Sequence, residues 1–235
     1  MVRRMSLLLR EFECADALDV ALSERLIDGL AAAIDARGEA ILAVSGGRTP
    51  AGLFKCLSDA PLDFSKVMIT LTDERCVPID HPDSNAQMVQ RLLLQGKAKQ
   101  ARFIPLYDAA LDLAAQRQTL NVQFNGLPTF DAVVLGMGLD GHTASLFPGA
   151  TGLSAAMDLS SDRAVTMMQP LTAPHARMSL TAARLLKTRA LILHVTGEEK
   201  LSLLNTVSGG VDVMQYPVGL FLTQNAPSTE VFWAP

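Results

Sequence analysis

Residues 132–148 read Ala-Val-Val-Leu-Gly-Met-Gly-Leu-Asp-Gly-His-Thr-Ala-Ser-Leu-Phe-Pro. The first four residues have the length and composition of a buried strand, and the turn after them contains three glycines and one histidine, His142. Glycines let a backbone come close to a bound ligand, and an imidazole can act as a base near neutral pH. A turn that only reversed the chain would need neither the third glycine nor the imidazole, which indicates a catalytic loop.

The rest of the chain alternates short apolar runs with segments of helical periodicity. Strands are expected at residues 7–12, 40–44, 67–71, 132–135, 164–168 and 190–195, and helices at 15–36, 50–58, 86–94, 108–124 and 198–207. Strands that are apolar on both faces and separated by helices predict an α/β fold with a mostly parallel sheet covered on each side. Residues 148–161 are expected to form a long loop. Residues 1–235 are expected to form a single domain, either alone or with a small lobe.

The composition narrows the class of protein. Hydrophobic residues make up 49% of the chain and charged residues 19%, which excludes a disordered or fibrous protein. The net charge of -4 does not favour binding of nucleic acid or an anionic membrane, so neither partner is expected. A small anion would have to be bound by cationic side chains at its own site. Three scattered cysteines without a Cys-x-x-Cys pair, and no apolar run that could span a bilayer, predict a reduced cytoplasmic protein.

A second glycine-rich turn lies between the strand at 40–44 and the helix at 50–58. It consists of Ser45, Gly46, Gly47, Arg48, Thr49 and Pro50. Thr49 is a suitable N-cap and Pro50 suits the first helical position, while the glycines let successive N–H groups converge on an anion. An ordinary strand–turn–helix connection would use similar residues. Arg48 favours phosphate binding, because a cation at a helix N-terminus opposes the macrodipole unless an anion lies there.

Charged residues follow two other predicted strands. Asp73 and Arg75 come directly after the strand at 67–71, and ligands of open parallel sheets bind beyond the carboxyl ends of strands. Taken alone, the composition of this segment is more typical of a solvated loop than of a site. Asn85, in the Ser-Asn pair that opens the next helix, could face the same site.

After the strand at 190–195, Thr196 and Glu199 have capping-box spacing, and Lys200 is a cation in the first helical turn. Arg177, before a small-residue turn, is a weaker candidate.

Other chemistries fit less well. Residues 136–141 satisfy the pattern G-x-G-x-x-G, but Pro148 interrupts the long helix that a dinucleotide site needs. No G-x-S-x-G elbow indicates a serine hydrolase, and no H-E-x-x-H or Cys/His cluster indicates zinc. His81 and His175 are isolated in the sequence, and His194 lies in an apolar strand and is expected in the core.

Taken in order, the motifs resemble those of the 6-phosphogluconolactonases, within the glucosamine-6-phosphate isomerase/deaminase superfamily. They are S-G-G-x-T-P at 45–50, D-E-R-x-V-P at 73–78, S-N at 84–85, G-x-G-x-D-G-H-T-A-S-L-F-P at 136–148, R-x-S-L-T at 177–181 and T-G-x-x-K at 196–200. The resemblance implies a Rossmann-like fold with helices on both faces of the sheet. It also implies hydrolysis of 6-phosphoglucono-δ-lactone in the pentose phosphate or Entner–Doudoroff route. Arg48 departs from the pattern, since a serine is common there.

The resemblance also suggests roles for these residues. His142 is the expected general base. Asp140 is expected to orient the imidazole or the water, and Arg75 to stabilise the oxyanion or bind substrate hydroxyls. Binding of substrate and phosphate is expected from Ser45, Gly46, Gly47, Arg48, Thr49, Asp73, Asn85, Gly138, Arg177 and Lys200, and which cations contact the phosphate stays open. No cofactor or metal is required, the only partner expected is the sugar-phosphate lactone, and the chain is expected to be a monomer or weak homodimer.

Two other functions were weighed against the lactonase. In glucosamine-6-phosphate deaminases the histidine turn continues toward Phe-Asn-Glu-Pro, whereas here residues 145–148 are Ser-Leu-Phe-Pro and lack the acid. A sugar-phosphate sensor that regulates transcription would need a basic DNA-binding module, for which the chain has neither the length nor the charge. Both comparisons favour the lactonase.

Overall fold

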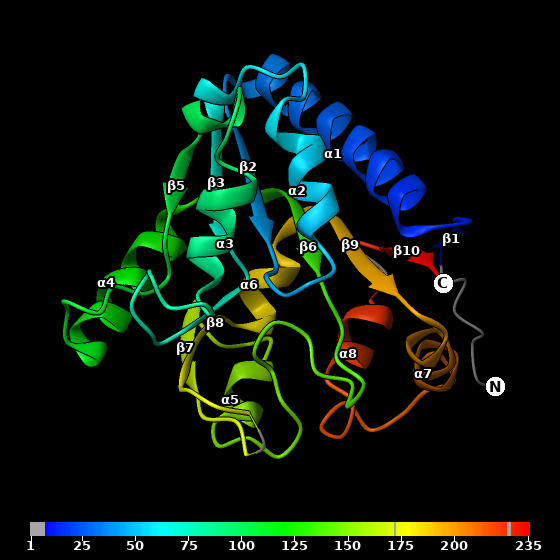
Figure 1. Cartoon of the computed structure of the whole chain (residues 1–235). Helices are drawn as coiled ribbons and strands as arrows, with labels where there is room; N and C mark the ends of the chain where they lie inside the picture. The colour runs from blue at the N-terminus through cyan, green and yellow to red at the C-terminus, as the bar shows by residue number, and fades with distance from the viewer. Residues whose placement is uncertain (1–7, 172, 225–226) are drawn as a thin grey trace.

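The computed structural model describes residues 8–171, 173–224 and 227–235. Within these residues, seven strands form one sheet in which every neighbouring pair is parallel (Figure 1). Their spatial order is β1 (Leu8–Glu11), β10 (Thr229–Ala234), β9 (Thr188–Thr196), β6 (Phe130–Leu135), β2 (Ala40–Val44), β3 (Val67–Leu71) and β5 (Arg102–Ile104). Every residue of the central strands β2 and β6 is buried, as expected for strands covered on both faces.

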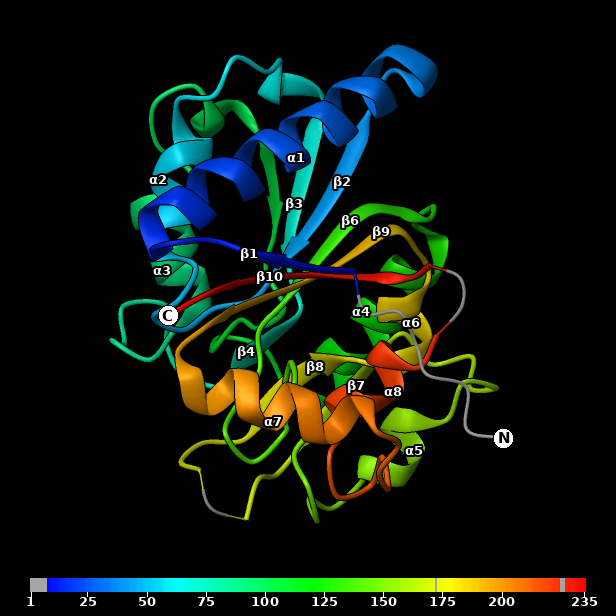
Figure 2. The same cartoon turned by 90° about the vertical axis from the view of Figure 1, so that its right-hand side faces the viewer.

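Helices cover both faces of this sheet. Helices α1 (Ala15–Arg37) and α2 (Ala51–Ser58) lie on one side of the strands, and α7 (Glu198–Ser208) and α8 (Val218–Leu222) lie on the other (Figure 2). The chain moves from β2 to β3 in one direction across the sheet and from β6 to β9 in the other. Because crossovers between parallel strands are right-handed, this reversal places the connecting helices on opposite faces. The prediction of a parallel α/β sheet with helices on both faces is confirmed.

A second, smaller sheet is antiparallel and was not expected. It contains β4 (Asp73–Arg75), β8 (Arg177–Leu180) and β7 (Val165–Met168), in that spatial order. The strand expected at 164–168 therefore exists as β7 but does not belong to the parallel sheet. Its pairing with β8 matters for the site, because the register places Arg75 opposite Arg177.

Several expected boundaries were wrong. The helix expected at 108–124 is α4 (Leu113–Gly126), which begins later because the Asp112 carboxylate accepts hydrogen bonds from the N–H groups of Ala114 and Ala115. The loop expected at 148–161 contains α5 (Leu153–Met157). Helices α3 (Asn85–Leu92) and α6 (Ala182–Leu186) and the 3₁₀ turns Phe64–Lys66 and Ala98–Gln100 complete the described elements. Residue 7 of the first expected strand lies outside the described residues.

One hydrophobic core joins the two sheets. Buried side chains from the parallel sheet, such as Val44 and Val134, belong to the same packed cluster as Val165 and Leu180 of the antiparallel sheet. In the part of the chain that the structure describes, no helix is both long and apolar enough to cross a membrane.

Candidate active site

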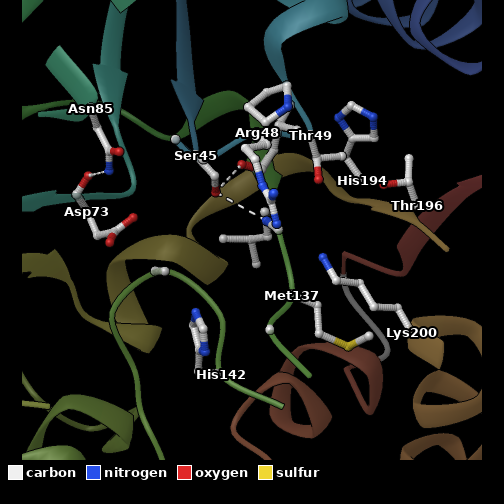
Figure 3. Close-up of a pocket in the computed structure, with 18 of the residues that line it drawn as sticks. Ser45, Arg48, Thr49, Asp73, Asn85, Met137, His142, His194, Thr196 and Lys200 are labelled. Atoms are coloured by element: carbon white, nitrogen blue, oxygen red, sulfur yellow. Dashed lines mark hydrogen bonds between the residues drawn. The ribbon is translucent and has the colours of Figure 1, made fainter. Parts of the chain in front are cut away.

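A cleft of about 700 Å³ opens at the carboxyl ends of β2, β3, β6 and β9 (Figure 3). Strands β2 and β6 are neighbours at the point where the chain reverses direction across the sheet, which is where open α/β sheets bind ligands. Twelve of the thirteen residues predicted from the sequence line this cleft: Ser45, Gly46, Gly47, Arg48, Thr49, Asp73, Arg75, Asn85, Gly138, His142, Arg177 and Lys200. The thirteenth, Asp140, contacts His142.

Ser45 joins the ends of three strands at the base of the cleft. Its hydroxyl donates to the carbonyl of Val134 (2.9 Å), accepts from the N–H of Gly136 (3.2 Å) and lies 2.9 Å from the hydroxyl of Thr72. Val134 and Gly136 belong to or follow β6, and Thr72 follows β3. The Ser45 side chain is therefore engaged by the protein framework, and the wall of the cleft is fixed by hydrogen bonds before any ligand binds.

The glycine turn after β2 is shaped by close packing. A Cβ on Gly46 would lie 1.9 Å from Oδ1 of Asn85, and Gly47 has a φ of 90°, a left-handed value that favours glycine.

The expected helix cap was wrong, because Pro50 is the N-cap of α2 and Thr49 does not cap it. The capping box expected at α7 was also wrong, since its N-cap is Gly197. Gly197 has a φ of 100° and offers no capping side chain. Lys200 lies in the first turn of α7, as expected.

Asp140 holds the imidazole of His142. Oδ1 of Asp140 lies 2.6 Å from Nδ1 of His142 and accepts its backbone N–H at 3.2 Å. Burial raises the pKa of Asp140, but the hydrogen bond and charge of His142 outweigh burial and leave this pKa below its ordinary value. The ring stacks on Phe147 with a centroid distance of 4.0 Å. With Nδ1 engaged by Asp140, Nε2 is the ring nitrogen available to a ligand.

Gly138 allows this arrangement of the loop. A Cβ at residue 138 would lie 2.2 Å from Nδ1 of His142 and 2.6 Å from Oδ1 of Asp140. Its N–H donates to the carbonyl of His142 at 2.9 Å, which closes the loop on itself. The first glycine of the loop, Gly136, meets no such contact. Gly138 is therefore required by the histidine and the aspartate together.

Two arginines line the cleft from the antiparallel sheet. Arg75 donates to the carbonyl of Asp83 at 2.5 Å, and Arg177 donates to the carbonyl of Pro174 at 3.3 Å. Burial lowers the pKa of Arg177, and the positive charge of Arg75 lowers it further. The Nε atoms of both arginines are buried and, among the described residues, have no hydrogen-bond partner. Most buried donors in folded proteins have a partner, so these two unpaired groups are exceptions in the wall of the cleft.

Arg48 and Lys200 form a second cationic side of the cleft. Figure 3 shows both charged groups directed into the same region, while the His142 ring enters from the opposite side. Burial lowers the pKa of Lys200, and the charge of Arg48 lowers it further. Neither cation has a carboxylate partner in the described part of the chain. Two neighbouring cations without an acid repel each other unless an anion binds between them.

Sequence reasoning missed the pair Asp19 and His194 at the back of the cleft. Oδ1 of Asp19 lies 3.4 Å from Nε2 of His194, and both residues are nearly fully buried. Burial raises the pKa of Asp19 to about 6 and lowers the pKa of His194 to about 4. His194 is buried, as expected, but it also lines the cleft. The Asp19 carboxylate packs closely against Gly52, where a Cβ would lie 1.9 Å from Oδ2 of Asp19.

Glu74 also has a role that the sequence did not reveal. Its carboxylate accepts the N–H groups of Asn85 (2.8 Å) and Ala86 (2.7 Å) at the start of α3, and that of Arg75 at 2.7 Å. Burial raises the pKa of Glu74, while these backbone donors act in the opposite direction. Glu74 therefore anchors α3 to β4 and positions Asn85 at the cleft.

Comparison with known proteins agrees with this geometry. Residues 13–233 match the family of glucosamine-6-phosphate isomerases/6-phosphogluconolactonases. The chain is 40% identical to a 6-phosphogluconolactonase of Pseudomonas putida over 225 residues, covering 95% of this chain and 92% of that protein. It is 42% identical to that of Rhizobium meliloti over 233 residues, covering 98% of this chain and all of the other.

Solved structures show the same fold. A crystal structure of a 6-phosphogluconolactonase from Shewanella baltica superposes with a TM-score of 0.94 at 37% identity and covers 98% of both chains. A monomeric glucosamine-6-phosphate deaminase superposes with a TM-score of 0.77 at 17% identity, over 96% of both chains, which shows the shared fold alone. The chain belongs to the glucosamine-6-phosphate isomerase/6-phosphogluconolactonase family.

Proposed function

We propose that this protein is a 6-phosphogluconolactonase, a carboxylic ester hydrolase that opens 6-phospho-D-glucono-1,5-lactone to 6-phospho-D-gluconate. The observation that carries the proposal is a histidine held by Asp140 across a cleft from two cations, Arg48 and Lys200, which have no acid partner among the described residues. This arrangement fits a substrate with a phosphate at one end and a reactive ester at the other. The names of the similar proteins agree with this assignment.

The phosphate is expected to lie against Arg48, Lys200 and the backbone of the 45–50 turn. Two cations compensate a phosphate dianion, and N–H groups of a glycine turn near a helix start add donors. Binding at this end fixes the position of the lactone ring in the cleft and replaces a diffusive encounter between ester and base. Binding of the substrate phosphate thus orients the reacting carbonyl.

At the other end, Nε2 of His142 takes a proton from a water molecule as the water oxygen forms a bond to C1. The carbonyl π electrons move to the oxygen, and Arg75 and Arg177 are expected to stabilise that oxyanion. When the tetrahedral intermediate collapses, the bond between C1 and the ring oxygen breaks, and the imidazolium returns its proton to that oxygen. Asp140 keeps Nδ1 protonated throughout and stabilises the imidazolium. The hydrolysis of this lactone is a step of the pentose phosphate or Entner–Doudoroff route.

The proposal is tested by acid release from freshly prepared lactone. The purified protein in weak buffer should release protons in proportion to enzyme concentration, above the spontaneous hydrolysis that is measured without it. A parallel assay with glucosamine 6-phosphate follows ammonium release. Acid release without ammonium supports the lactonase, ammonium release supports a deaminase, and tight binding of 6-phosphogluconate without turnover supports a sensor.

Replacing Lys200 with alanine should raise KM for the lactone by about 10- to 100-fold, because a hydrogen bond to a charged group contributes about 1.5–3 kcal/mol. The turnover number kcat should change little, since the phosphate does not react. Steady-state proton release gives both constants. Lys99→Ala, an exposed lysine outside the cleft, is the matched control. An unchanged KM in Lys200→Ala places the phosphate elsewhere.

A further inference from the structure

Two histidines that are isolated in the sequence lie together in the structure. His81 follows β4 and His175 precedes β8, and these two strands are antiparallel neighbours. The pairing therefore brings together loops that are distant in the sequence. Asp83 completes the group: it lies 92 residues before His175, yet its Oδ2 is 3.1 Å from Nε2 of that histidine. None of the three side chains lines the active-site cleft.

The donor atoms are spaced for one small cation. Nδ1 of His81 lies 3.9 Å from Oδ2 of Asp83, and one ligand atom from each of the three residues lies within 4.8 Å of the others. Nitrogen and oxygen ligands at about 2.0–2.1 Å from a tetrahedral Zn²⁺ are about 3.4 Å apart. Small side-chain rotations would bring the three residues to this spacing.

The surroundings allow a cation to enter. The side chains of His81, Asp83 and His175 are 37%, 50% and 29% exposed, so they can be reached from solvent without unfolding. The imidazole rings meet edge to face at 78°, with their centroids 5.3 Å apart. At present Nδ1 of His81 accepts the backbone N–H of Asp83 at 3.1 Å, a contact that a metal at this nitrogen would replace.

We propose that His81, Asp83 and His175 bind a divalent transition metal of the Zn²⁺ class, with water completing the coordination. Two imidazoles and one carboxylate suit Zn²⁺, Co²⁺ or Ni²⁺, whereas Mg²⁺ and Ca²⁺ prefer oxygen ligands alone. The site is outside the catalytic cleft, and its metal has no part in lactone hydrolysis. This inference does not depend on the proposed function.

The site would connect the two loops that adjoin the arginine-bearing strands β4 and β8. Arg75 donates to the backbone carbonyl of Asp83, and Arg177 lies two residues after His175. A metal bound to both loops restrains both arginines without contacting the substrate. Its expected effect is therefore on the stability of this sheet edge.

The test uses untagged, chelator-treated protein carrying Cys14→Ser, because Cys14 is an exposed thiol that could bind metal by itself. Calorimetric titration with ZnCl₂ should give one site per chain, and Co²⁺ should give visible d–d absorption. At 100 times the dissociation constant, Zn²⁺ should raise Tm by about 5 °C. Asp83→Asn and His175→Ala should each weaken binding by at least about 100-fold.

The matched control is Asp80→Asn, an exposed carboxylate in the same loop outside the group of three. It should bind Zn²⁺ like the parent protein. Metal-free Tm values show whether each variant is folded, so lost binding can be separated from lost structure. Absence of saturable binding below about 100 μM metal would overturn the proposal, as would equal binding by the parent, Asp83→Asn and His175→Ala proteins.

Discussion

Replacing His142 with alanine is expected to lower kcat for lactone hydrolysis by about 10²- to 10⁴-fold, the contribution of one general base. In the proposed mechanism the imidazole removes a proton from the attacking water, and Asp140 supports the ring through its contact with Nδ1. KM should change by no more than a few-fold, because the cations proposed to bind the phosphate, Arg48 and Lys200, lie across the cleft from His142. Proton release from fresh lactone, corrected for spontaneous hydrolysis, measures both constants.

Two further measurements separate chemistry from folding in this variant. His142 stacks on Phe147, so its loss also removes packing, and a thermal melt must show that the protein remains folded. Binding of 6-phosphogluconate, measured by calorimetry, should stay close to that of the parent protein. Unchanged turnover in a folded His142→Ala protein would remove the histidine from the mechanism.

Replacing Gly138 with alanine is expected to lower kcat by about 100-fold or more, although residue 138 itself offers no reactive group. The added Cβ would lie 2.2 Å from Nδ1 and 2.3 Å from Cε1 of His142, so the ring must move away from its contact with Asp140. Displacement of a catalytic group by about 1 Å costs about 10²-fold in rate. Steady-state kinetics measure the loss, and KM should change much less than kcat.

The matched control for Gly138→Ala is Gly126→Ala. A Cβ on Gly126 at the end of α4 meets no atom within 4 Å, and this residue is outside the cleft. Gly126→Ala should retain the activity and the Tm of the parent protein. Full activity in Gly138→Ala would mean that the loop relaxes around the methyl group and that its close packing does not position His142.

The strands that the sequence predicted best are apolar and largely buried. Strands β2 and β3 begin and end where expected because each is an apolar run bounded by polar residues. Strand β10 was missed although it lies inside the parallel sheet, because it contains a glutamate. Glu230 is tolerated there since Arg25 and Arg10 pair with it at 2.7 Å and 3.0 Å. A charge that is neutralised by distant residues cannot be recognised from the strand itself.

Most of the predicted cleft residues lie together because they follow strands of one parallel sheet, a rule that needs no knowledge of side-chain packing. Arg177 is an exception, since it belongs to β8 of the antiparallel sheet. Asp19 was missed for the opposite reason, since it lies within a helix and reaches the cleft only through the packing of α1 against α2. His81 and His175 were missed because their proximity follows from the pairing of β4 with β8. Both strands are too short for the sequence pattern to predict.

The position of β10 between β1 and β9 has a consequence for biosynthesis. Leu8 pairs with Glu230, so β1 has no neighbouring strand until the ribosome has synthesised nearly the whole of the described chain. Contacts between residues so distant in sequence form slowly, and unpaired strand edges promote aggregation. The nascent chain therefore carries exposed edges at β1 and β9 during translation, and chaperones that shield such edges should increase the yield of native protein.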